Sequence, residues 1–494
     1  MAERGYLVVD CGASAGRAVV ARFDGRRFTL EETHRFENRP VSAAGTLYWD
    51  VLRLFSEIGI GLQKSLKACP RLASMGVDTW GVDFGLIDAR GKLLANPIHY
   101  RDQRRNGLTD EVYRLVPRDE MFRLSGALIL SIMSVFNLYA MRRDSAFELE
   151  SARRFLMMPD LLHYLLTGVE SNEWSDACTT AVFNQSEKRW EERILDRLGI
   201  PRGIFGPPVA PGTRIGPLSP SVRAELGAGA LSVIAPATHD TASAVAGIPA
   251  RPSGEPWAFI SIGTWGVVGM EIERPVLDSA VLDAGWGNEG GADGGTFLAV
   301  NVAGLWLAQQ CRRRWMADRG EDIQWDDIVR AALGARRLGT IIDVDDQVFS
   351  GVHPDEPGVI SGYCRERGLR PPEGIGETAR CIYESLALKF RFRLEELARL
   401  TGRRVGLVHM VGGGTQNEPL CQWTADATGI PVEAGPVETT VAGNLLMQLK
   451  GTGEIASVSQ GRAVVALSSK TKLHAPGDRS AWDDAYQRLM KLGA

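Results

Sequence analysis

Two stretches of the chain, residues 6–23 and 257–272, repeat one plan: a β-rich run, a glycine, a hydroxyl residue, a glycine and a second β-rich run. The first reads YLVVDCGASAGRAVVARF and the second reads WAFISIGTWGVVGMEI. Two β-rich runs joined by small residues predict a β-hairpin. Because internal repetition reports architecture before any single motif does, we expect two related domains, each opening with such a hairpin.

The clearest change in composition lies between the two repeats. The stretch 247–256 reads GIPARPSGEP and holds three prolines in ten residues, which is typical of a linker. We therefore expect an N-terminal domain over residues 1–246 and a C-terminal domain over residues 257–494. A chain of 494 residues is long enough for two large domains.

Short buried runs alternate with amphipathic segments in both halves, which favours the α/β class. In the first half we expect a helix over 51–66 capped by Asp50, strands over 74–79, 82–87 and 233–235, a mostly helical stretch over 105–200 and a loop over 201–217. In the second half we expect a helix over 381–400, a strand over 405–411, a helix that Asn417 caps and that ends at 428, and a strand over 430–434.

The charge balance, the N-terminal residues and the cysteine pattern limit which partners and which location we expect for this chain. The 56 basic and 60 acidic side chains leave a net charge of −4, which disfavours nucleic acid and membrane surfaces as partners. The first residues hold no apolar run long enough for a signal peptide, so a cytoplasmic location is expected. The seven scattered cysteines form no CxxC pair, and whether Cys364 and Cys381 pair stays open.

The first hairpin tip, Asp10–Arg17, suits a polyphosphate. Its sequence DCGASAGR contains GxSxG, but a serine-hydrolase elbow needs strand–turn–helix, and RAVVARF predicts a second strand. Closely spaced glycines let backbone N–H groups approach phosphates, while Ser14 and Arg17 add a hydroxyl and a guanidinium. Asp10 can reach a phosphate-bound Mg²⁺ through water. Neither a P-loop nor a GxGxxG fingerprint occurs in the chain.

Other motifs add candidate chemistry. Thr264, in the second hairpin, offers another hydroxyl, and VGGGTQN at 411–417 leads from a strand through glycines into a helix. Asp240, in ATHDTA just before the linker, is a candidate general base. In VDTWGVDF at 77–84, two acidic residues and Trp80 suit a polyol pocket, with the indole stacking on a sugar face.

The motifs DCGASAGR, GVDTWGVDF, HYRDQR, HDTASAV, ISIGTWG, NEGGADG and VGGGTQN follow the order seen in the FGGY carbohydrate kinases. From about residue 5 to about 450 the chain resembles that family, and most of all its rhamnulokinase branch. The resemblance implies two actin-like (ribonuclease H-like) ATPase domains of the α/β class with a central cleft. It also implies that ATP and Mg²⁺ bind against the second domain and that a ketose binds against the first.

The resemblance further implies roles for single residues. Asp240 is expected as the catalytic base and Asp10 as the carboxylate near magnesium, acting through water. The expected triphosphate contacts are Ala13, Ser14, Ala15, Gly16, Arg17 and Thr264. The expected adenosine contacts are Gln309 and the turn Gly412–Gly414, chiefly Gly413 and Gly414. The expected ketose contacts are Gly81, His239, Thr241 and Asn301, to which the polyol argument adds Trp80 and the base Asp240.

The implied reaction is transfer of the ATP γ-phosphoryl group to the 1-hydroxyl of L-rhamnulose. Two departures leave the ketose open: Ala15 and Thr415 stand where relatives often carry Ser and Cys. L-Fuculose and L-xylulose therefore remain alternative substrates. An actin-like nucleotide switch that binds a protein partner is the alternative outside this family, and the sequence leaves monomer and homodimer equally open.

Overall fold

The computed structural model describes residues 3–251 and 255–493, so residues 252–254 of the expected linker lie outside the described residues. The chain forms two compact units. The first comprises Met1–Arg251, Glu271–Leu298 and Thr439–Ser468, and the second comprises Pro252–Met270, Ala299–Glu438 and Ser469–Ala494. This division differs from the expected one, because two later segments of the chain pack with the first unit.

The first unit is built on a sheet of strand order β11-β12-β6-β1-β2-β3. Its central strand β1 runs antiparallel to β2 and parallel to β6, and β6 runs parallel to β12. The expected hairpin is confirmed as strand–turn–strand. The strands are β1 (Arg4–Cys11), β2 (Ala15–Phe23), β3 (Phe28–Glu37), β6 (Leu72–Thr79), β11 (Arg214–Pro217) and β12 (Ser232–Ile234).

After β3, the short antiparallel strands β4 (Val41–Ala43) and β5 (Thr46–Tyr48) lead into helix α1 (Val51–Ala68), which precedes β6 and begins where the sequence predicts. The Asp50 side chain accepts a hydrogen bond from the backbone N–H of Arg53, which satisfies one of the free donors at a helix start. Val51, Ile58 and Leu62 are buried on one face of the helix, as the apolar periodicity predicts. The helix therefore packs on the sheet that carries Asp10 and helps to hold that sheet in place.

The stretch 105–200 is mostly helical, as expected, and also contains short strands. Strand β7 (Phe84–Ile87) pairs antiparallel with β8 (Arg154–Met157), and both belong to an apolar core that includes Phe136 and Phe183. The other elements of the stretch are α2 (Leu108–Leu115), α3 (Arg118–Ser125), α4 (Ser134–Arg143), α5 (Phe147–Glu150), α6 (Met158–Thr167), α7 (Trp174–Ala177), β9 (Phe183–Asn184), β10 (Arg189–Trp190) and α8 (Glu192–Arg197).

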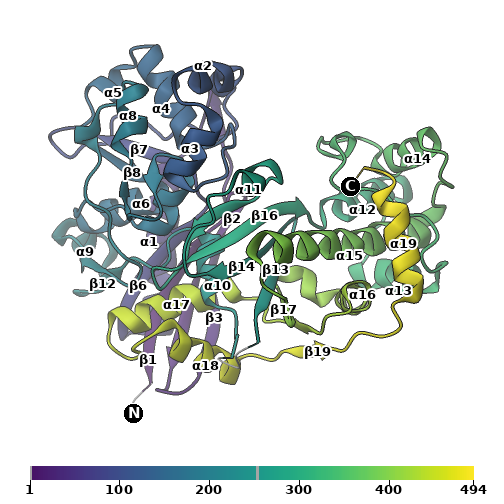
Figure 1. The fold of residues 1–494 in the computed structure, drawn as a ribbon. Coiled ribbons are helices and arrows are strands. Elements are labelled where there is room, and N and C mark those ends of the chain that lie inside the picture. Colours follow the sequence, from purple (N-terminus) through teal and green to yellow (C-terminus); the bar gives the residue numbers. More distant parts are fainter. Residues whose placement is uncertain (1–2, 252–254, 494) are drawn as a thin grey trace. The chain divides into compact units, whose positions relative to one another are not determined.

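The second unit repeats the strand plan of the first. The second sheet has seven strands in the order β15-β16-β14-β13-β17-β18-β19, with β15 spanning Gly287–Gly290, and β13 runs antiparallel to β14 and parallel to β17 (Figure 1). Apart from β15, each strand has a counterpart in the first sheet, including an antiparallel edge strand beside β12 and beside β18. The strands are β13 (Trp257–Ile262), β14 (Trp265–Ile272), β16 (Thr296–Ala303), β17 (Leu407–Val411), β18 (Val432–Ala434) and β19 (Lys472–His474).

Helix α15 (Gly374–Thr401) is the longest helix of the second unit and precedes β17. It ends at Gly402, whose φ of 66° is the left-handed conformation that commonly terminates helices. The other helices of this unit are α12 (Trp306–Arg319), α13 (Trp325–Gly334), α14 (Glu356–Glu366), α16 (Glu418–Thr428) and α19 (Ser480–Met490). Asn417 caps α16 by accepting from Leu420 N–H, as predicted.

Helices α17 (Thr439–Gly451) and α18 (Val458–Ser468) return to the first unit, where α17 packs against β1, β6 and α10 (Asp240–Ala246) (Figure 1). The contacts are polar as well as apolar. The Asn444 amide donates to the Asp78 carboxylate at 2.5 Å, and the Gln448 amide donates to the Leu7 carbonyl at 2.9 Å. Since buried polar groups require partners, these bonds fix α17 against the first sheet.

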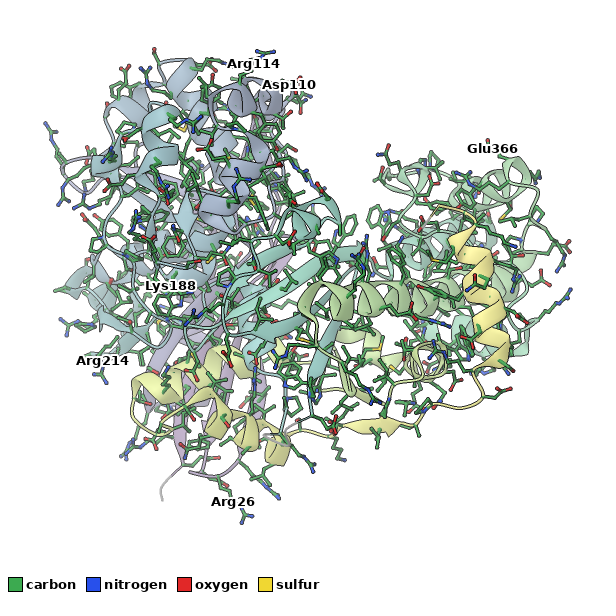
Figure 2. The ribbon with its side chains drawn as sticks, in the orientation of Figure 1. Arg26, Asp110, Arg114, Lys188, Arg214 and Glu366 are labelled. Atoms are coloured by element: carbon green, nitrogen blue, oxygen red, sulfur yellow. The ribbon has the colours of Figure 1, made fainter. Side chains whose placement is uncertain are left out.

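Charged side chains lie on the outside of each unit, as for Asp110 and Arg114 of α2 and for Arg26 after β2 (Figure 2). Over the described part of the chain, every helix is either too short or too polar to span a membrane. Cys364 and Cys381 are both buried free thiols, so they are not bridged.

Candidate active site

The tip of the first hairpin is held by one asparagine from the end of β3. Asn38 donates from its backbone N–H to the Ser14 carbonyl and from its amide to the Gly12 carbonyl, each at 3.0 Å. With two of the tip carbonyls taken up by Asn38, the conformation of the turn is set before any ligand binds. The strand–turn–strand geometry excludes the serine-hydrolase elbow that GxSxG alone suggests.

Gly16 is required at its position by a neighbouring ring. A Cβ added there would lie 2.2 Å from the Phe36 ring, far inside any real contact distance. The aromatic ring therefore packs directly on the hairpin backbone. Ala15, beside it, is exposed, so the missing hydroxyl at this position leaves a methyl group facing outward.

Asp10 and Arg17 face each other across the hairpin. They are paired in the β1–β2 register, and the Arg17 guanidinium donates to one Asp10 oxygen at 2.9 and 3.0 Å. The structure thus brings together two of the residues expected at the phosphates.

Asp78 is a carboxylate that the site prediction left out. It is the register partner of Asp10 on the parallel strand β6, and it is fully buried. One of its oxygens accepts from Asn444, while the other has no hydrogen-bond partner among the described residues. Burial, together with the nearby Asp10, raises the pKa of Asp78 well above its usual value. The sequence signal for Asp78 is the VDTW motif, which by sequence alone predicts only a polyol pocket.

Asp240 begins α10, immediately after a segment that extends the first sheet. His239 forms a parallel bridge with Thr79 at the end of β6, so Asp10, Asp78 and Asp240 lie at the same end of neighbouring strands. The Thr241 hydroxyl donates to the Asp240 carboxylate at 3.2 Å. Burial raises the pKa of Asp240, and the neighbouring His239 opposes that rise.

The backbone that carries His239 is anchored on a buried glutamate. Glu173 accepts from the backbone N–H and the hydroxyl of Thr238, at 2.9 and 2.8 Å, and also from the hydroxyl of Ser175. The Ser175 hydroxyl in turn accepts from the backbone N–H of His239 at 3.3 Å. This network positions the HDT motif by its main chain and leaves the three side chains available for other contacts.

The structure does not favour the stacking role expected of Trp80. Its side chain is in the core at 6% exposure, its ring packs 4.1 Å from that of Trp49, and its indole N–H donates to Asp83. Asp83 also accepts a hydrogen bond from Trp49 and forms an ion pair with Arg105. Its carboxylate is thus engaged in the core and has a structural role rather than that of a polyol ligand. Gly81, the next residue, packs closely on Thr179, where an added Cβ would lie 2.7 Å away.

In the second unit, Thr264 and Gln309 are in contact, as the predicted nucleotide contacts require. The Gln309 amide donates to the Thr264 hydroxyl at 3.2 Å. The backbone N–H groups of Leu305, just before α12, and of Trp306, its first residue, donate to the carbonyls of Gly263 and Thr264. Gly304 permits this approach, because an added Cβ would lie 2.6 Å from the Thr264 carbonyl oxygen. The second hairpin is thus held by α12.

The glycine turn after β17 lies against the same hairpin. Gly412 has φ 88°, and added Cβ atoms at Gly412 and Gly414 would meet Ile262 at 2.8 and 2.6 Å. Gly413, between them, has no described atom within 4 Å of such a Cβ, so its face is open to a ligand. Asn301, expected at the ketose, lies exposed on β16 in the second unit, whereas Gly81, His239 and Thr241 lie in the first.

Comparison with known families decides the assignment. The N-terminal domain of the FGGY family of carbohydrate kinases matches residues 5–247, and the C-terminal domain of that family matches residues 258–451. The chain belongs to the FGGY family of carbohydrate kinases. The nucleotide-switch alternative is therefore set aside, and the sugar kinase class that the motifs implied is confirmed.

Relatives within this kinase family match nearly the full chain. A protein named rhamnulokinase from Bacteroides thetaiotaomicron is 37% identical over 98% of both chains. Another rhamnulokinase, from Enterococcus faecalis, is 35% identical over 99% of this chain and 98% of its own.

Solved structures of sugar kinases share the fold. A xylulose kinase from Lactobacillus acidophilus superposes with a TM-score of 0.80 at 14% identity, covering 99% of this chain and 97% of that one. A glycerol kinase from Plasmodium falciparum, solved with ADP, superposes with a TM-score of 0.76 at 14% identity, covering 99% and 98%. The two-domain actin-like fold expected of an FGGY kinase is confirmed.

The carboxylates of the first unit fit a hydrated magnesium ion better than a directly ligated one. Among the described residues, no three His, Cys, Asp or Glu side chains are grouped so as to ligate a metal. Asp10 is partly open to solvent, and the buried Asp78 beside it has an unpartnered oxygen. Mg²⁺ commonly keeps several waters and takes its other ligands from substrate phosphates.

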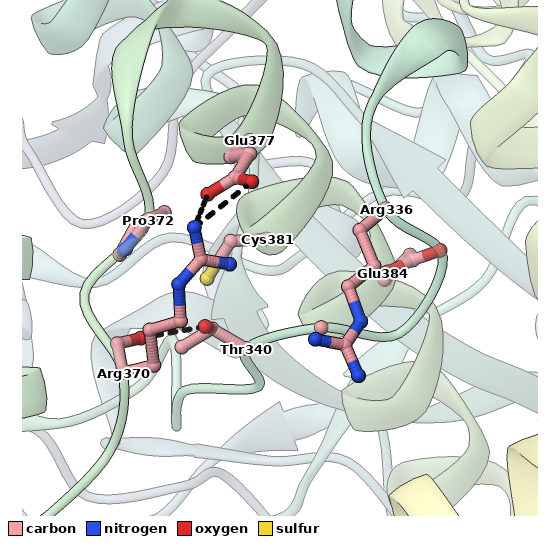
Figure 3. Close-up of a pocket in the computed structure, with 8 residues that line it drawn as sticks. Arg336, Thr340, Arg370, Pro372, Glu377, Cys381 and Glu384 are labelled. Atoms are coloured by element: carbon pink, nitrogen blue, oxygen red, sulfur yellow. Dashed lines mark hydrogen bonds and ion pairs between the residues drawn. The ribbon is translucent and has the colours of Figure 1, made fainter.

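One small pocket of this kinase lies apart from the predicted site residues (Figure 3). It is in the second unit, and its polar groups are already engaged: Arg370 pairs with Glu377 at 3.1 Å, and the Thr340 hydroxyl donates to the Arg370 carbonyl at 2.6 Å. The lining residues are Arg336, Gly339, Thr340, Arg370, Pro372, Glu377, Cys381 and Glu384.

Proposed function

We propose that this protein is an ATP-dependent kinase that converts L-rhamnulose and ATP into L-rhamnulose 1-phosphate and ADP. The observation that carries the proposal is the near-complete match to proteins named rhamnulokinase at 33–37% identity. The local geometry supports the same reaction class, because the expected base Asp240 begins a helix at the sheet end that also bears Asp10.

In the first unit, Asp240 accepts the proton of the sugar 1-hydroxyl as the oxygen attacks the γ-phosphorus of ATP. The bond between the γ-phosphorus and the bridging oxygen breaks, and ADP leaves. The Ser14 hydroxyl, the Arg17 guanidinium and the N–H groups of the hairpin tip stabilise the charge on the transferred phosphoryl group. Gly81, His239 and Thr241 orient the ketose.

In the second unit, Thr264 and Gln309 bind the phosphates and ribose side of the nucleotide, and the open face at Gly413 receives the adenosine. Asp10, acting through water, is the residue that holds magnesium, with Asp78 beside it. Bound to the ATP phosphates, Mg²⁺ supplies neutralising charge. Asn301 adds a polar contact to the ketose.

A panel of ketoses tests the substrate. Coupled ADP release is measured with L-rhamnulose, L-fuculose, L-xylulose and D-xylulose at equal concentrations, and the product is identified by ³¹P and ¹³C NMR. We expect the highest kcat/KM with L-rhamnulose and phosphorylation at C1. A higher kcat/KM with another ketose would reassign the substrate within the family, while ADP release indifferent to every ketose would contradict a ketose kinase.

A further inference from the structure

A glutamate to which the proposed mechanism gives no role lies against the imidazole of His239. The Glu289 carboxylate, on β15 (Gly287–Gly290), is 3.2 Å from Nδ1 of His239. Both residues belong to the first unit. On its other side, Nε2 of His239 is 3.7 Å from the Asp240 carboxylate. The imidazole is thus placed between a glutamate and the proposed base.

Strand β15 holds Glu289 firmly through its neighbours on both sides. The Asn288 side chain accepts from the backbone N–H of Val276 and donates to the Gly126 carbonyl, both at 2.8 Å. Gly290 packs so closely on α7 that an added Cβ would lie 2.9 Å from Cys178 and from Ser175. Because side chains alternate along a strand, fixing these two neighbours fixes the side on which Glu289 emerges.

The charges that face His239 come from three elements. They are Glu289 from β15, Asp240 from α10 and Asp176 from α7, and each raises the pKa of His239. Burial alone lowers that pKa, yet the combined carboxylates, led by Glu289, raise it to about 9. At neutral pH the ring therefore carries a proton, and its positive charge opposes the rise that burial imposes on the pKa of Asp240.

We propose that Glu289 is a positioning residue that keeps the His239 imidazole protonated and directs its Nε2–H toward Asp240 and the ketose. This inference rests on the proposed function for its kinetic consequence only. The protonated ring keeps Asp240 ionised, as a general base must be, and gives the site a donor that a neutral ring with its proton on Nδ1 lacks. Glu289 acts through His239 and needs no contact with the sugar.

Histidine NMR tests the proposal without any substrate. The protein is labelled with ¹³C/¹⁵N-histidine, the His239 signals are assigned with a His239→Gln variant, and pH is varied from 5 to 10. We expect wild-type His239 to titrate near pH 9. Glu289→Gln should lower this midpoint by about two units, a hundredfold loss of proton affinity. A wild-type midpoint at or below about 6.5, the ordinary histidine value, overturns the proposal even if the variant fails to fold.

The pH dependence of kcat/KM is a second measurement. Loss of structure alone would lower kcat/KM at every pH, whereas the proposal predicts a loss mainly at high pH. With Glu289→Gln, the proton leaves His239 at lower pH, so kcat/KM for the ketose should fall about tenfold at pH 8 and stay within about twofold of wild type at pH 6. An equal loss at both pH values, or an unmoved His239 midpoint, overturns the proposal.

The second unit offers a matched control. His409 of β17 and Glu433 of β18 form a similar pair, with Nδ1 3.5 Å from the carboxylate. Glu433→Gln should leave the pH profile of kcat/KM unchanged, and a profile shifted as in Glu289→Gln overturns the assignment to Glu289. If no ketose is phosphorylated by the wild type, the proposed function fails, while the His239 titration still decides the role of Glu289.

Discussion

At the scale of single residues, the Asp240 carboxylate stands beside two others, Asp10 and Asp78, at the ends of neighbouring strands. The paired register of β1 and β6 makes Asp10 and Asp78 neighbours, and both raise the cost of ionising a further carboxylate nearby. Arg17 and His239 supply the opposing positive charge. For Asp240 itself, burial raises the pKa most, His239 lowers it and Asp10 raises it.

We predict that Asp240→Asn lowers turnover by about 10²–10⁴, the usual contribution of a general base, because the amide cannot accept the hydroxyl proton. The affinity for ATP should stay close to wild type. The measurements are kcat by coupled ADP release and the dissociation constant of ATP by isothermal titration calorimetry. Turnover above about a tenth of the wild-type value would remove Asp240 from the role of base.

The sequence was a sound guide to some of these residues and silent on others. Glycine and hydroxyl spacing led to Ser14 and Thr264, since both follow from hairpin tips that a sequence displays directly. Asp78 and Glu289 were missed as members of the site, because their significance depends on neighbours far along the chain. Asp78 meets Asn444, and Glu289 meets His239. No local pattern encodes such contacts.

At the scale of elements, α10 and α17 approach each other so closely that only glycine fits at the contact. A Cβ added at Gly443 of α17 would lie 1.8 Å from the Ser243 carbonyl oxygen, and one at Gly247 would lie 2.1 Å from the Thr439 carbonyl oxygen. Both obstacles are backbone atoms, which cannot move without shifting a helix. Since α10 begins at Asp240, this contact also sets the position of the proposed base.

We predict that Gly443→Ala lowers the free energy of unfolding by about 1–3 kcal/mol or more, as overpacking does, and reduces turnover as well. Urea unfolding followed by circular dichroism measures the first effect. The matched control is Gly362→Ala in α14, where no described atom lies within 4 Å of the added Cβ. It should raise the stability by about 0.5–1 kcal/mol. Equal stability of the two variants would contradict the close contact.

The boundaries of elements differ from prediction for local physical reasons. The strand expected from Val82 begins at Phe84, because Val82 has φ 69°, a left-handed conformation outside the β region. The strand expected from Ile430 begins at Val432, after Pro431, which has no N–H for a ladder. Within the expected loop over 201–217, residues Arg214–Pro217 form the edge strand β11, whose glycine and proline hid it.

At the scale of the whole molecule, the two sheets share the order of six strands, as the repeated hairpins led us to expect, and the second sheet adds β15 at one edge. The compact units do not follow the linker alone, however, because α17 and α18 belong to the first unit. Asn444 and Gln448 of α17 bond to Asp78 and Leu7 near the start of the chain. A sequence read in order gives no sign of such distant partners, so the family boundary near residue 247 is not a boundary of folding.

We predict that a fragment of residues 1–251 fails to unfold cooperatively in urea. Without α17, the Asp78 oxygen that accepts from Asn444 and the Leu7 carbonyl lose their partners, and the apolar face of the helix is missing. The measurement is far-UV circular dichroism and near-UV signal against urea concentration. Co-expression with residues 252–494 is the control and should restore a sharp transition. A sharp transition for the fragment alone would mean that α17 is dispensable.

The return of α17 to the first sheet also bears on synthesis of the chain. A nascent chain that has released Arg251 still lacks the helix that covers β1 and β6, and at 5–20 residues per second the ribosome needs roughly 10–40 s more to deliver it. Throughout that interval the emerging first unit exposes apolar surface, which is the kind of surface that chaperones bind. The first unit can therefore become native only after α17 has been synthesised, and not as soon as its N-terminal segment is complete.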